Sequence, residues 1–262
     1  MITLKSGLSI TNENFSIVLS HQRPARVILA VPHDGLFEDN FTGIFQPRMS
    51  GRKIHDLNVS IIANNIVQRS LSLGVRVDML RLLMSRAYID ANRELPDDLD
   101  PATHTLDQTA LDDPLLIPVH HYYYSELHRL VERSIQMFGI EQILFIDMHG
   151  FGHQPKFAPP KGYDIILGTA NRSNIQHGEV DRTFAEFMEE RGYRVFLPGE
   201  KSITPEGDPF SGRYTTEWCA KKYGINAMQI EIFSTFRMMP QNRERGEKLA
   251  VDVAEFLSEN YR

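Results

Sequence analysis

The feature that most constrains this chain is the alternation of short apolar, β-branched runs with longer stretches of helical periodicity. Buried strands are predicted at 26–32, 75–84, 143–147, 163–169, 193–198 and 228–233. Helices are predicted at 57–72, 124–138, 180–190 and 243–260. Strands that alternate with helices favour an α/β fold, in which a mixed, largely parallel sheet lies between helical layers.

One large hydrophobic core suits a chain of this size. The 262 residues are 42% hydrophobic, and no Pro/Gly/Ser-rich linker, low-complexity tract or internal repeat divides them. We therefore expect a single domain over 1–262. The polar stretch 90–113, with Pro96 and Pro101, is expected to be a long surface excursion that shapes access to an active site.

The charge and the apolar segments bear on possible partners, and the cysteine content bears on location. A net charge of −6 argues against nucleic acid and anionic membranes as partners, because phosphate recognition needs a basic surface. No stretch has the roughly 18 to 20 apolar residues that span a bilayer. Cys219 is the only cysteine and the N-terminus has no apolar signal segment, so a cytoplasmic location is expected, although a periplasmic protein without disulfides would share these features. A homo-oligomer is compatible with this composition.

Two of the predicted strands lead into a histidine. The strand at 26–32 continues into His33, and the strand at 143–147 continues through Met148 into His149. The carboxyl ends of neighbouring parallel strands meet at one edge of a sheet, where α/β proteins carry their sites. Two histidines and one carboxylate make a catalytic zinc site with one position left for water or substrate. The alternative is a coincidence among ten histidines.

Two carboxylates belong to the same predicted strands. Asp147 lies two residues before His149, so both side chains point the same way and the carboxylate can orient the imidazole. Glu231 interrupts an otherwise apolar strand, and next to a metal-bound water it would be a suitable general base. The alternatives are that Asp147 caps a strand end and that Glu231, like the nearby Gln229, lies on an exposed strand face.

A further cluster of polar residues lies between positions 86 and 93. Arg86, Asp90, Asn92 and Arg93 occur close together there. Arginine offers a planar fork that binds a carboxylate through two hydrogen bonds, and asparagine can hold an amide or carboxylate oxygen. The group is a candidate anion-recognition site. The alternative is a solvated charged loop. Without other evidence, these four residues favour that alternative.

Five short motifs follow one another along the chain. They are V-P-H-D-G at 31–35, S-R-A-Y-I-D-A-N-R at 85–93, I-D-M-H-G at 146–150, D-I-I-L-G-T at 164–169 and A-M-Q-I-E-I at 227–232. In this order they resemble the motifs of the N-formylglutamate amidohydrolase family. The resemblance implies a three-layer αβα fold of the zinc-exopeptidase or phosphorylase/hydrolase-like kind, similar to the zinc carboxypeptidases and the aspartoacylase/succinylglutamate desuccinylase group. It also implies hydrolysis of a linear amide C–N bond in an N-acyl amino acid such as N-formylglutamate, with one Zn²⁺ per chain.

The resemblance also implies roles for individual residues. His33 and His149 would bind zinc, with Asp147 supporting His149. Glu231 would act first as general base and then as general acid. The carboxylate or carbonyl of an amino-acid-derived substrate would be held by Asn92 and Arg93, with Arg86 nearby, an arginine would stabilise the oxyanion, and Arg213 would add a carboxylate contact.

The third metal ligand is not given by the histidine motif. Enzymes of the carboxypeptidase group use His-x-x-Glu, and here the last position is Leu36, which has no ligand atom. Family members that depart in this way carry an Asp farther along, ahead of a helix, and Asp56 occupies that place. We therefore rank Asp56 first, Glu38 second and His55 third.

Two other functions remain as alternatives. A metallocarboxypeptidase or peptidoglycan amidase would share the site and differ in its pocket. A binding protein with a decayed metal site is the non-enzymatic alternative, supported by Leu36. A serine hydrolase is disfavoured because the chain has no G-x-S-x-G motif, and Cys219 in its Trp-Cys-Ala context is expected to pack as a small hydrophobe.

Overall fold

One sheet forms the centre of the molecule. The computed structural model describes residues 2–3, 8–38, 43–93, 110–152, 162–197, 210–238 and 240–262. The strands in this part of the chain are β1 (Ile2–Thr3), β2 (Leu8–Glu13), β3 (Ser16–His21), β4 (Val27–Val31), β5 (Val77–Leu82), β6 (Leu144–Phe151), β7 (Ile165–Gly168), β8 (Val195–Phe196) and β9 (Asn226–Phe233). Their order in the sheet is β1-β2-β3-β5-β4-β6-β9-β7-β8.

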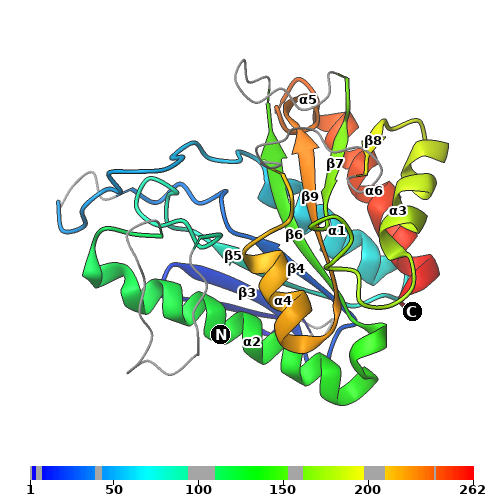
Figure 1. The fold of residues 1–262 in the computed structure, drawn as a ribbon, viewed down its shortest axis with the longest axis horizontal. Helices are drawn as coiled ribbons and strands as arrows, with labels where there is room; N and C mark the ends of the chain where they lie inside the picture. The colour runs from blue at the N-terminus through cyan, green and yellow to red at the C-terminus, as the bar shows by residue number, and fades with distance from the viewer. Residues whose placement is uncertain are drawn as a thin grey trace.

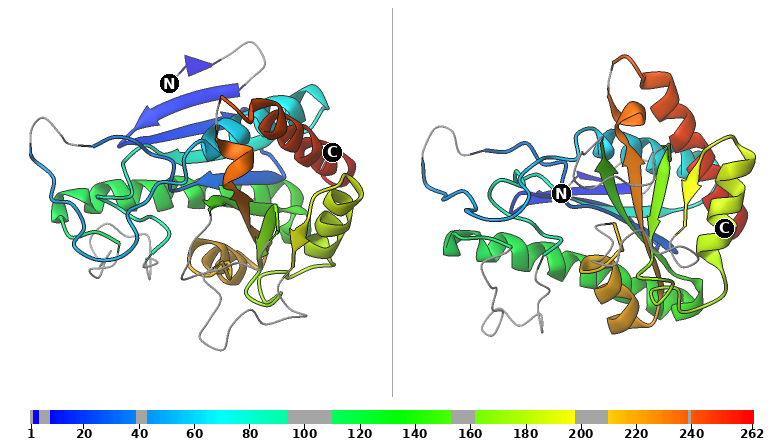
Figure 2. Two further views of the ribbon diagram at one scale, coloured as in Figure 1. Left: turned by 90° about the horizontal axis from the view of Figure 1, so that it is seen from above. Right: turned by 45° about the horizontal axis from the view of Figure 1, so that its top comes forward.

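Helices cover both faces of this sheet (Figure 1). The described helices are α1 (Val59–Ser72), α2 (Ile117–Phe138), α3 (Val180–Glu190), α4 (Thr215–Tyr223), α5 (Ser234–Arg237) and α6 (Arg243–Asn260), with short 3-10 helices η1 (Pro114–Leu116) and η2 (Ile140–Gln142). None of these helices is long and apolar enough to cross a membrane. Seen from above, α2 and α4 lie on one side of the sheet, and α1 and α6 on the other (Figure 2).

Each side of the sheet has its own apolar core. Ile28 and Phe145 belong to the core shared with α2 and α4, whereas Leu29 and Ile146 belong to the core shared with α1 and α6. The alternation follows from the period of two in a strand, where successive side chains leave opposite faces. The predicted three-layer αβα fold is confirmed.

The strand directions explain where a site can form. β5, β4, β6 and β9 are parallel neighbours, so their carboxyl ends lie together. β3 and β7 flank this group in the antiparallel direction. The predicted mixed sheet is confirmed, and the two strands that lead to histidines, β4 and β6, are adjacent and parallel as expected.

Several boundaries differ from the predicted ones. β6 runs through His149 to Phe151 instead of ending at Asp147, because these residues continue to pair with β9. α2 begins at Ile117 instead of Tyr124. The strands β1 to β3 are not among the predicted elements.

The predicted surface excursion at 90–113 is only partly described. Residues 94–109 lie outside the described range. Asp90 and Asp113, at its two ends, are buried, and Asp113 accepts backbone hydrogen bonds from Gln46 and Leu115. The prediction is therefore wrong for these ends, which belong to the folded body because protein donors offset the cost of burying the carboxylates.

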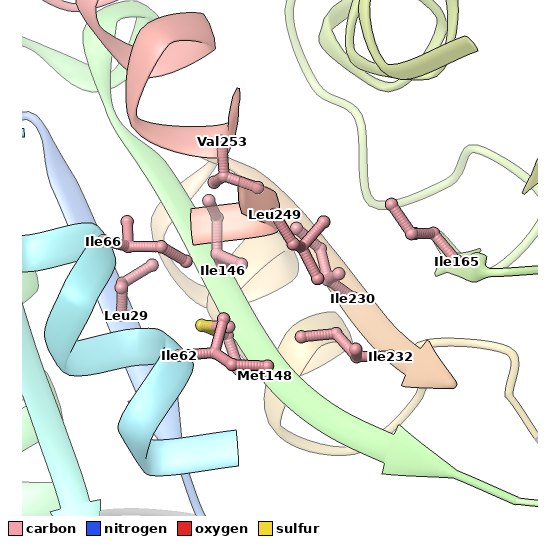
Figure 3. A pocket seen from close by; sticks show the side chains of 10 residues that line it. All are labelled: Leu29, Ile62, Ile66, Ile146, Met148, Ile165, Ile230, Ile232, Leu249 and Val253. Carbon is pink, nitrogen blue, oxygen red and sulfur yellow. The ribbon is translucent and has the colours of Figure 1, made fainter. Parts of the chain in front are cut away.

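A small apolar cavity lies between the sheet and the helices α1 and α6 (Figure 3). Its volume is about 10 Å³, and ten apolar side chains line it, among them Ile62, Met148 and Leu249. Its wall has no polar side chain that could hold a water molecule. The cavity is therefore a packing gap in this core.

Candidate metal centre and active site

Three buried donor atoms converge at the carboxyl ends of β4 and β6. His33 follows β4, His149 lies in β6, and Asp56 lies in the loop before α1. The two Nδ1 atoms are 3.0 Å apart, and Asp56 Oδ2 is 3.4 Å from His33 Nδ1 and 3.3 Å from His149 Nδ1. Tetrahedral zinc with bonds of about 2.0–2.1 Å holds its donor atoms about 3.3 Å apart. The three residues therefore fit a divalent ion such as zinc.

The contact made by Nε2 of each imidazole determines whether its Nδ1 can bind a metal ion. His33 Nε2 is 2.6 Å from Asp90 Oδ1, and His149 Nε2 is 3.1 Å from Asp147 Oδ2. Because a carboxylate only accepts, each Nε2 donates, and in a neutral ring each Nδ1 then presents a lone pair. Two lone pairs 3.0 Å apart repel each other unless a cation or a proton lies between them. The arrangement therefore has the donor chemistry of a metal site.

The electrostatics of the cluster agree with this interpretation. Burial alone would lower the pKa of His149, but the carboxylates of Asp147, Asp56 and Glu231 raise it to about 10. Burial alone would raise the pKa of Asp56, but the imidazoles of His149 and His33 hold it well below its usual range. The cluster thus favours a positive charge at its centre, which a metal ion can supply in place of a proton.

The other two candidates for third ligand lie in a separate group. His55 Nδ1 donates to the carbonyl oxygen of Gly35 at 2.7 Å, and His55 Nε2 is 3.3 Å from Ser85 Oγ. Ser85 Oγ donates to Glu38 Oε1 at 3.1 Å. Of the three residues considered, the structure brings Asp56 to the two histidines and places Glu38 and His55 with Ser85.

Asp90 supports His33 as Asp147 supports His149. Its second oxygen, Oδ2, accepts from Arg86 Nε at 3.0 Å and lies 2.9 Å from Arg86 Nη2. Both residues are buried, so Arg86 is already paired with a carboxylate of the protein. The role of Asp90 was missed because His33 lies 57 residues away in the sequence, and no local spacing connects the two.

Asn92 is held in one orientation beside these pairs. Its Oδ1 accepts from the backbone N–H of Thr215 at 3.2 Å and from the Thr215 hydroxyl at 3.1 Å. Its Nδ2 is therefore turned toward the three candidate metal ligands, 3.3 Å from His149 Nε2. Since His149 Nε2 already carries a hydrogen for Asp147, the amide hydrogens of Asn92 are available to another acceptor.

The two arginines near the start of α4 differ in their surroundings. The guanidinium of Arg93 is half-buried and lies over the Tyr214 ring, 4.8 Å from its centroid. Tyr214 has a φ of 58°, which is strained for a residue with a side chain. Arg213 is exposed in the same turn. Arg93 is thus the better fixed of the two.

Glu231 lies directly beside His149 in the sheet. The two are paired residues of β9 and β6, and Glu231 is only 5% exposed, so the alternative of an exposed strand carboxylate is wrong. Its Oε1 accepts from Gln229 Nε2 at 2.7 Å, whereas Oε2 has no hydrogen-bond partner within the described ranges. Burial raises the pKa of Glu231 to about 7, with His149 opposing this shift and Asp56 adding to it. Such a group can gain and lose a proton near neutral pH.

Arg237, which no sequence motif indicated, connects the segments that carry the site. Its guanidinium donates to the carbonyl oxygens of Ile232 at 3.0 Å, Leu57 at 2.6 Å and Phe151 at 3.1 Å. A Cβ at Gly150 would lie 2.3 Å from the Arg237 Cζ atom. The glycine of I-D-M-H-G therefore leaves the space that Arg237 fills.

Comparison with known proteins finds a matching family and several similar folds. The family described as N-formylglutamate amidohydrolase matches residues 25–238. The fold is similar to that of an N-formylglutamate amidohydrolase from Ralstonia eutropha JMP134, with 20% identity and a TM-score of 0.60 over 94% of this chain and 99% of that chain. A gene product of Agrobacterium tumefaciens matches with 14% identity and a TM-score of 0.61, over 97% of this chain and 94% of that chain. A metallo-carboxypeptidase from Pseudomonas aeruginosa matches with 12% identity and a TM-score of 0.48, over 98% of this chain and 66% of that chain. No curated protein matches the sequence.

Proposed function

This chain belongs to the N-formylglutamate amidohydrolase family, and we propose that it is a metal-dependent hydrolase that cleaves the amide bond of an N-acyl amino acid such as N-formylglutamate. Membership of the family supports a hydrolase. The observation that carries the proposal is the convergence of His33, His149 and Asp56 beside the buried Glu231. The proposed substrate class is a small amino-acid derivative that bears a carboxylate.

We propose one Zn²⁺ per chain, held by His33, Asp56 and His149 through the three converging atoms. When bound, the ion would supply a Lewis acid that polarises the amide carbonyl and makes water more acidic. Asp90 and Asp147 hold the two imidazoles in the tautomer that leaves Nδ1 free for this purpose. Both carboxylates are therefore proposed to contribute to metal affinity.

Glu231 is proposed as the group that moves the proton. Its Oε2, which has no partner in the described structure, can accept a proton from the attacking water and then donate it to the leaving nitrogen. The water oxygen forms the new bond to the acyl carbon and the C–N bond breaks, which gives a carboxylic acid and an amine. A pKa of about 7 suits both transfers.

Asn92 and Arg93 are proposed to hold oxygen atoms of the substrate. Thr215 donates to the side-chain Oδ1 of Asn92, so Nδ2 is the end of the amide that would face a substrate carbonyl or carboxylate. Arg93 would offer a charged fork to the substrate carboxylate or to the developing oxyanion. Arg213 is a proposed further contact, and Arg86, paired with Asp90, would reach substrate only through its remaining Nη1 group.

Metal analysis and substrate assays test the proposal together. The purified protein should contain stoichiometric zinc and should hydrolyse N-formylglutamate faster than small peptides or peptidoglycan fragments. A preference for the peptides would indicate a carboxypeptidase or an amidase. Absence of bound metal at neutral pH would indicate a binding protein.

Two substitutions separate the proposed roles. His149→Ala should lose metal, whereas Glu231→Gln should keep metal and lose turnover by about 100-fold or more, because the amide does not take up the proton. Metal content and kcat of the purified variants measure this. Stoichiometric zinc together with full activity in a His33→Ala/His149→Ala double variant would rule the site out.

A further inference from the structure

The carboxylate of Glu231 is held from within its own strand. Gln229 and Glu231 are two residues apart in β9, so their side chains leave the same face of the sheet. Gln229 Nε2 donates to Glu231 Oε1 at 2.7 Å, and both residues are buried. Within the described ranges Gln229 is the only donor to this carboxylate, and Oε2 has no partner.

The orientation of the Gln229 amide follows from the chemistry of the contact. A carboxylate oxygen only accepts hydrogen bonds, so the amide oxygen of Gln229 would repel it at 2.7 Å. The NH₂ end therefore faces Glu231. As a result one carboxylate oxygen is occupied and the other is left for a different partner.

The neighbouring strand β6 repeats this arrangement. Asp147 and His149 are also two residues apart, and Asp147 Oδ2 lies 3.1 Å from His149 Nε2. In the sheet register Asp147 pairs with Gln229, and His149 pairs with Glu231. On both strands the first residue of the pair thus contacts the second. This leaves Nδ1 of His149 and Oε2 of Glu231 available to the proposed site.

We propose that Gln229 is a positioning residue, which fixes the Glu231 carboxylate so that Oε2 is presented to the reacting water. This inference rests on the proposed function, because it takes Glu231 as the proton-transferring group. Gln229 acts only through Glu231 and does not touch substrate. A hydrogen bond that served stability alone would change the fraction of folded protein and not the turnover of each folded molecule.

Gln229→Leu tests the proposal, because it removes the donor at similar size. The matched control is Gln176→Leu, which removes an exposed amide that donates to the Ser173 carbonyl oxygen. Both variants are assayed with N-formylglutamate at saturating zinc. We expect Gln229→Leu to lower kcat by about 10- to 100-fold through loss of orientation, with KM and zinc content unchanged. Gln176→Leu should keep the wild-type kcat.

A second variant covers the case in which Gln229→Leu does not fold. Gln229→Met keeps the length of the side chain and removes the donor without adding a charge or an acidic proton, so it should lose kcat as well. A wild-type kcat in either folded variant, or a loss confined to KM or to zinc content, would overturn the positioning role. If Glu231→Gln kept its turnover, the proposed function and the positioning role would both fail. An inactive Glu231→Gln beside a fully active Gln229→Leu would overturn the positioning role alone.

Discussion

At the residue scale, the site is built from pairs in which one side chain fixes the group that acts. Asp90 holds Nε2 of His33, and Asp147 holds Nε2 of His149. Each carboxylate leaves the opposite nitrogen free as the proposed ligand atom and raises its basicity. Metal affinity should therefore depend on residues that never touch the ion.

Asp90→Asn should weaken zinc binding by about 10- to 100-fold. The amide oxygen can still accept from His33, but it carries no charge, and Arg86 loses its ion-pair partner. Competition for zinc between the protein and a chelator measures the affinity. Glu38→Gln is the control, because Glu38 contacts Ser85 away from the histidines, and it should bind zinc as the wild type does. Equal affinity in the two variants would contradict the role of Asp90.

The distance in sequence between partners decided which of these pairs could be predicted. Asp147 and His149 are two residues apart in one strand, so their common direction follows from strand geometry. The pairing of Asp90 with His33 depends on how β4 and the loop after β5 meet, which local spacing does not encode. Asp56 was ranked first only through the family resemblance, and the structure places it beside both histidines.

At the scale of elements, Arg237 should matter for the alignment of β6, β9 and the loop before α1. Gly150→Ala would put a Cβ 2.3 Å from its guanidinium carbon, so the side chain must leave its carbonyl acceptors. We expect a loss of about 1–3 kcal/mol in the free energy of unfolding, together with weaker zinc binding. Denaturant unfolding and zinc titration measure the two effects.

Gly152→Ala is the matched control for this change. Gly152 lies just beyond the end of β6, and among the residues that the structure describes a Cβ there would meet only Ser234 atoms, at 3.9 and 4.0 Å. Its unfolding and its zinc affinity should stay close to those of the wild type. If Gly150→Ala were as stable as Gly152→Ala, Arg237 would not be the reason for the glycine.

Asp78 makes stability depend on pH where β5, β3 and α2 meet. It is fully buried, accepts from the backbone N–H of His21 at 2.9 Å and lies 3.7 Å from Arg133. Burial raises the pKa of Asp78 to about 6, against the opposing effects of the His21 N–H and Arg133. The unfolded chain ionises this residue near pH 4, so between about pH 4 and 6 the folded state binds more protons and loses stability as the pH rises.

Asp78→Asn should remove this pH dependence. Its stability relative to the wild type should increase from about pH 4.5 to about pH 7.5, by up to about 3 kcal/mol. Denaturant unfolding of both metal-free proteins at the two pH values measures the difference, in which the contributions of all other titrating groups cancel. A difference that stays constant or shrinks with rising pH would contradict the buried, proton-binding Asp78.

The elements that were predicted poorly have two different physical causes. The turn between β2 and β3 places Asn14 and Phe15 at positive φ angles of 44° and 56°. Neither residue is glycine, so the usual hairpin signal is absent from this segment. β6 continues past its predicted end because β9 supplies a pairing partner, and that partner lies far along the chain.

At the scale of the whole molecule, the sheet separates the chemistry from one of the two cores. In β6 and β9, His149 and Glu231 leave one face, whereas Met148 and Ile230 leave the other and join the core with α1 and α6. The α/β class followed from periodicity. The antiparallel positions of β3 and β7 did not, because strand order depends on packing between distant segments.

Leu249→Ala should therefore reduce stability without changing the chemistry. Leu249 lies in α6 and lines the cavity of about 10 Å³ behind β6 and β9 (Figure 3). Its truncation enlarges a gap that the surrounding helices already leave unfilled, so we expect the free energy of unfolding to fall by about 2–5 kcal/mol. Zinc affinity and kcat, measured well below the unfolding midpoint, should remain those of the wild type because His149 and Glu231 leave the opposite face of the sheet.

Leu115→Ala is the control for this separation, because Leu115 is 60% exposed and its truncation should leave the free energy of unfolding, the zinc affinity and kcat unchanged. Unchanged stability in Leu249→Ala would mean that the core closes around the missing side chain. Weakened zinc binding in a fully folded Leu249→Ala would mean that strain passes through the strands from Met148 to His149, so that the two faces of the sheet are coupled. The pair of variants therefore measures how independent the proposed metal site is from the core behind it.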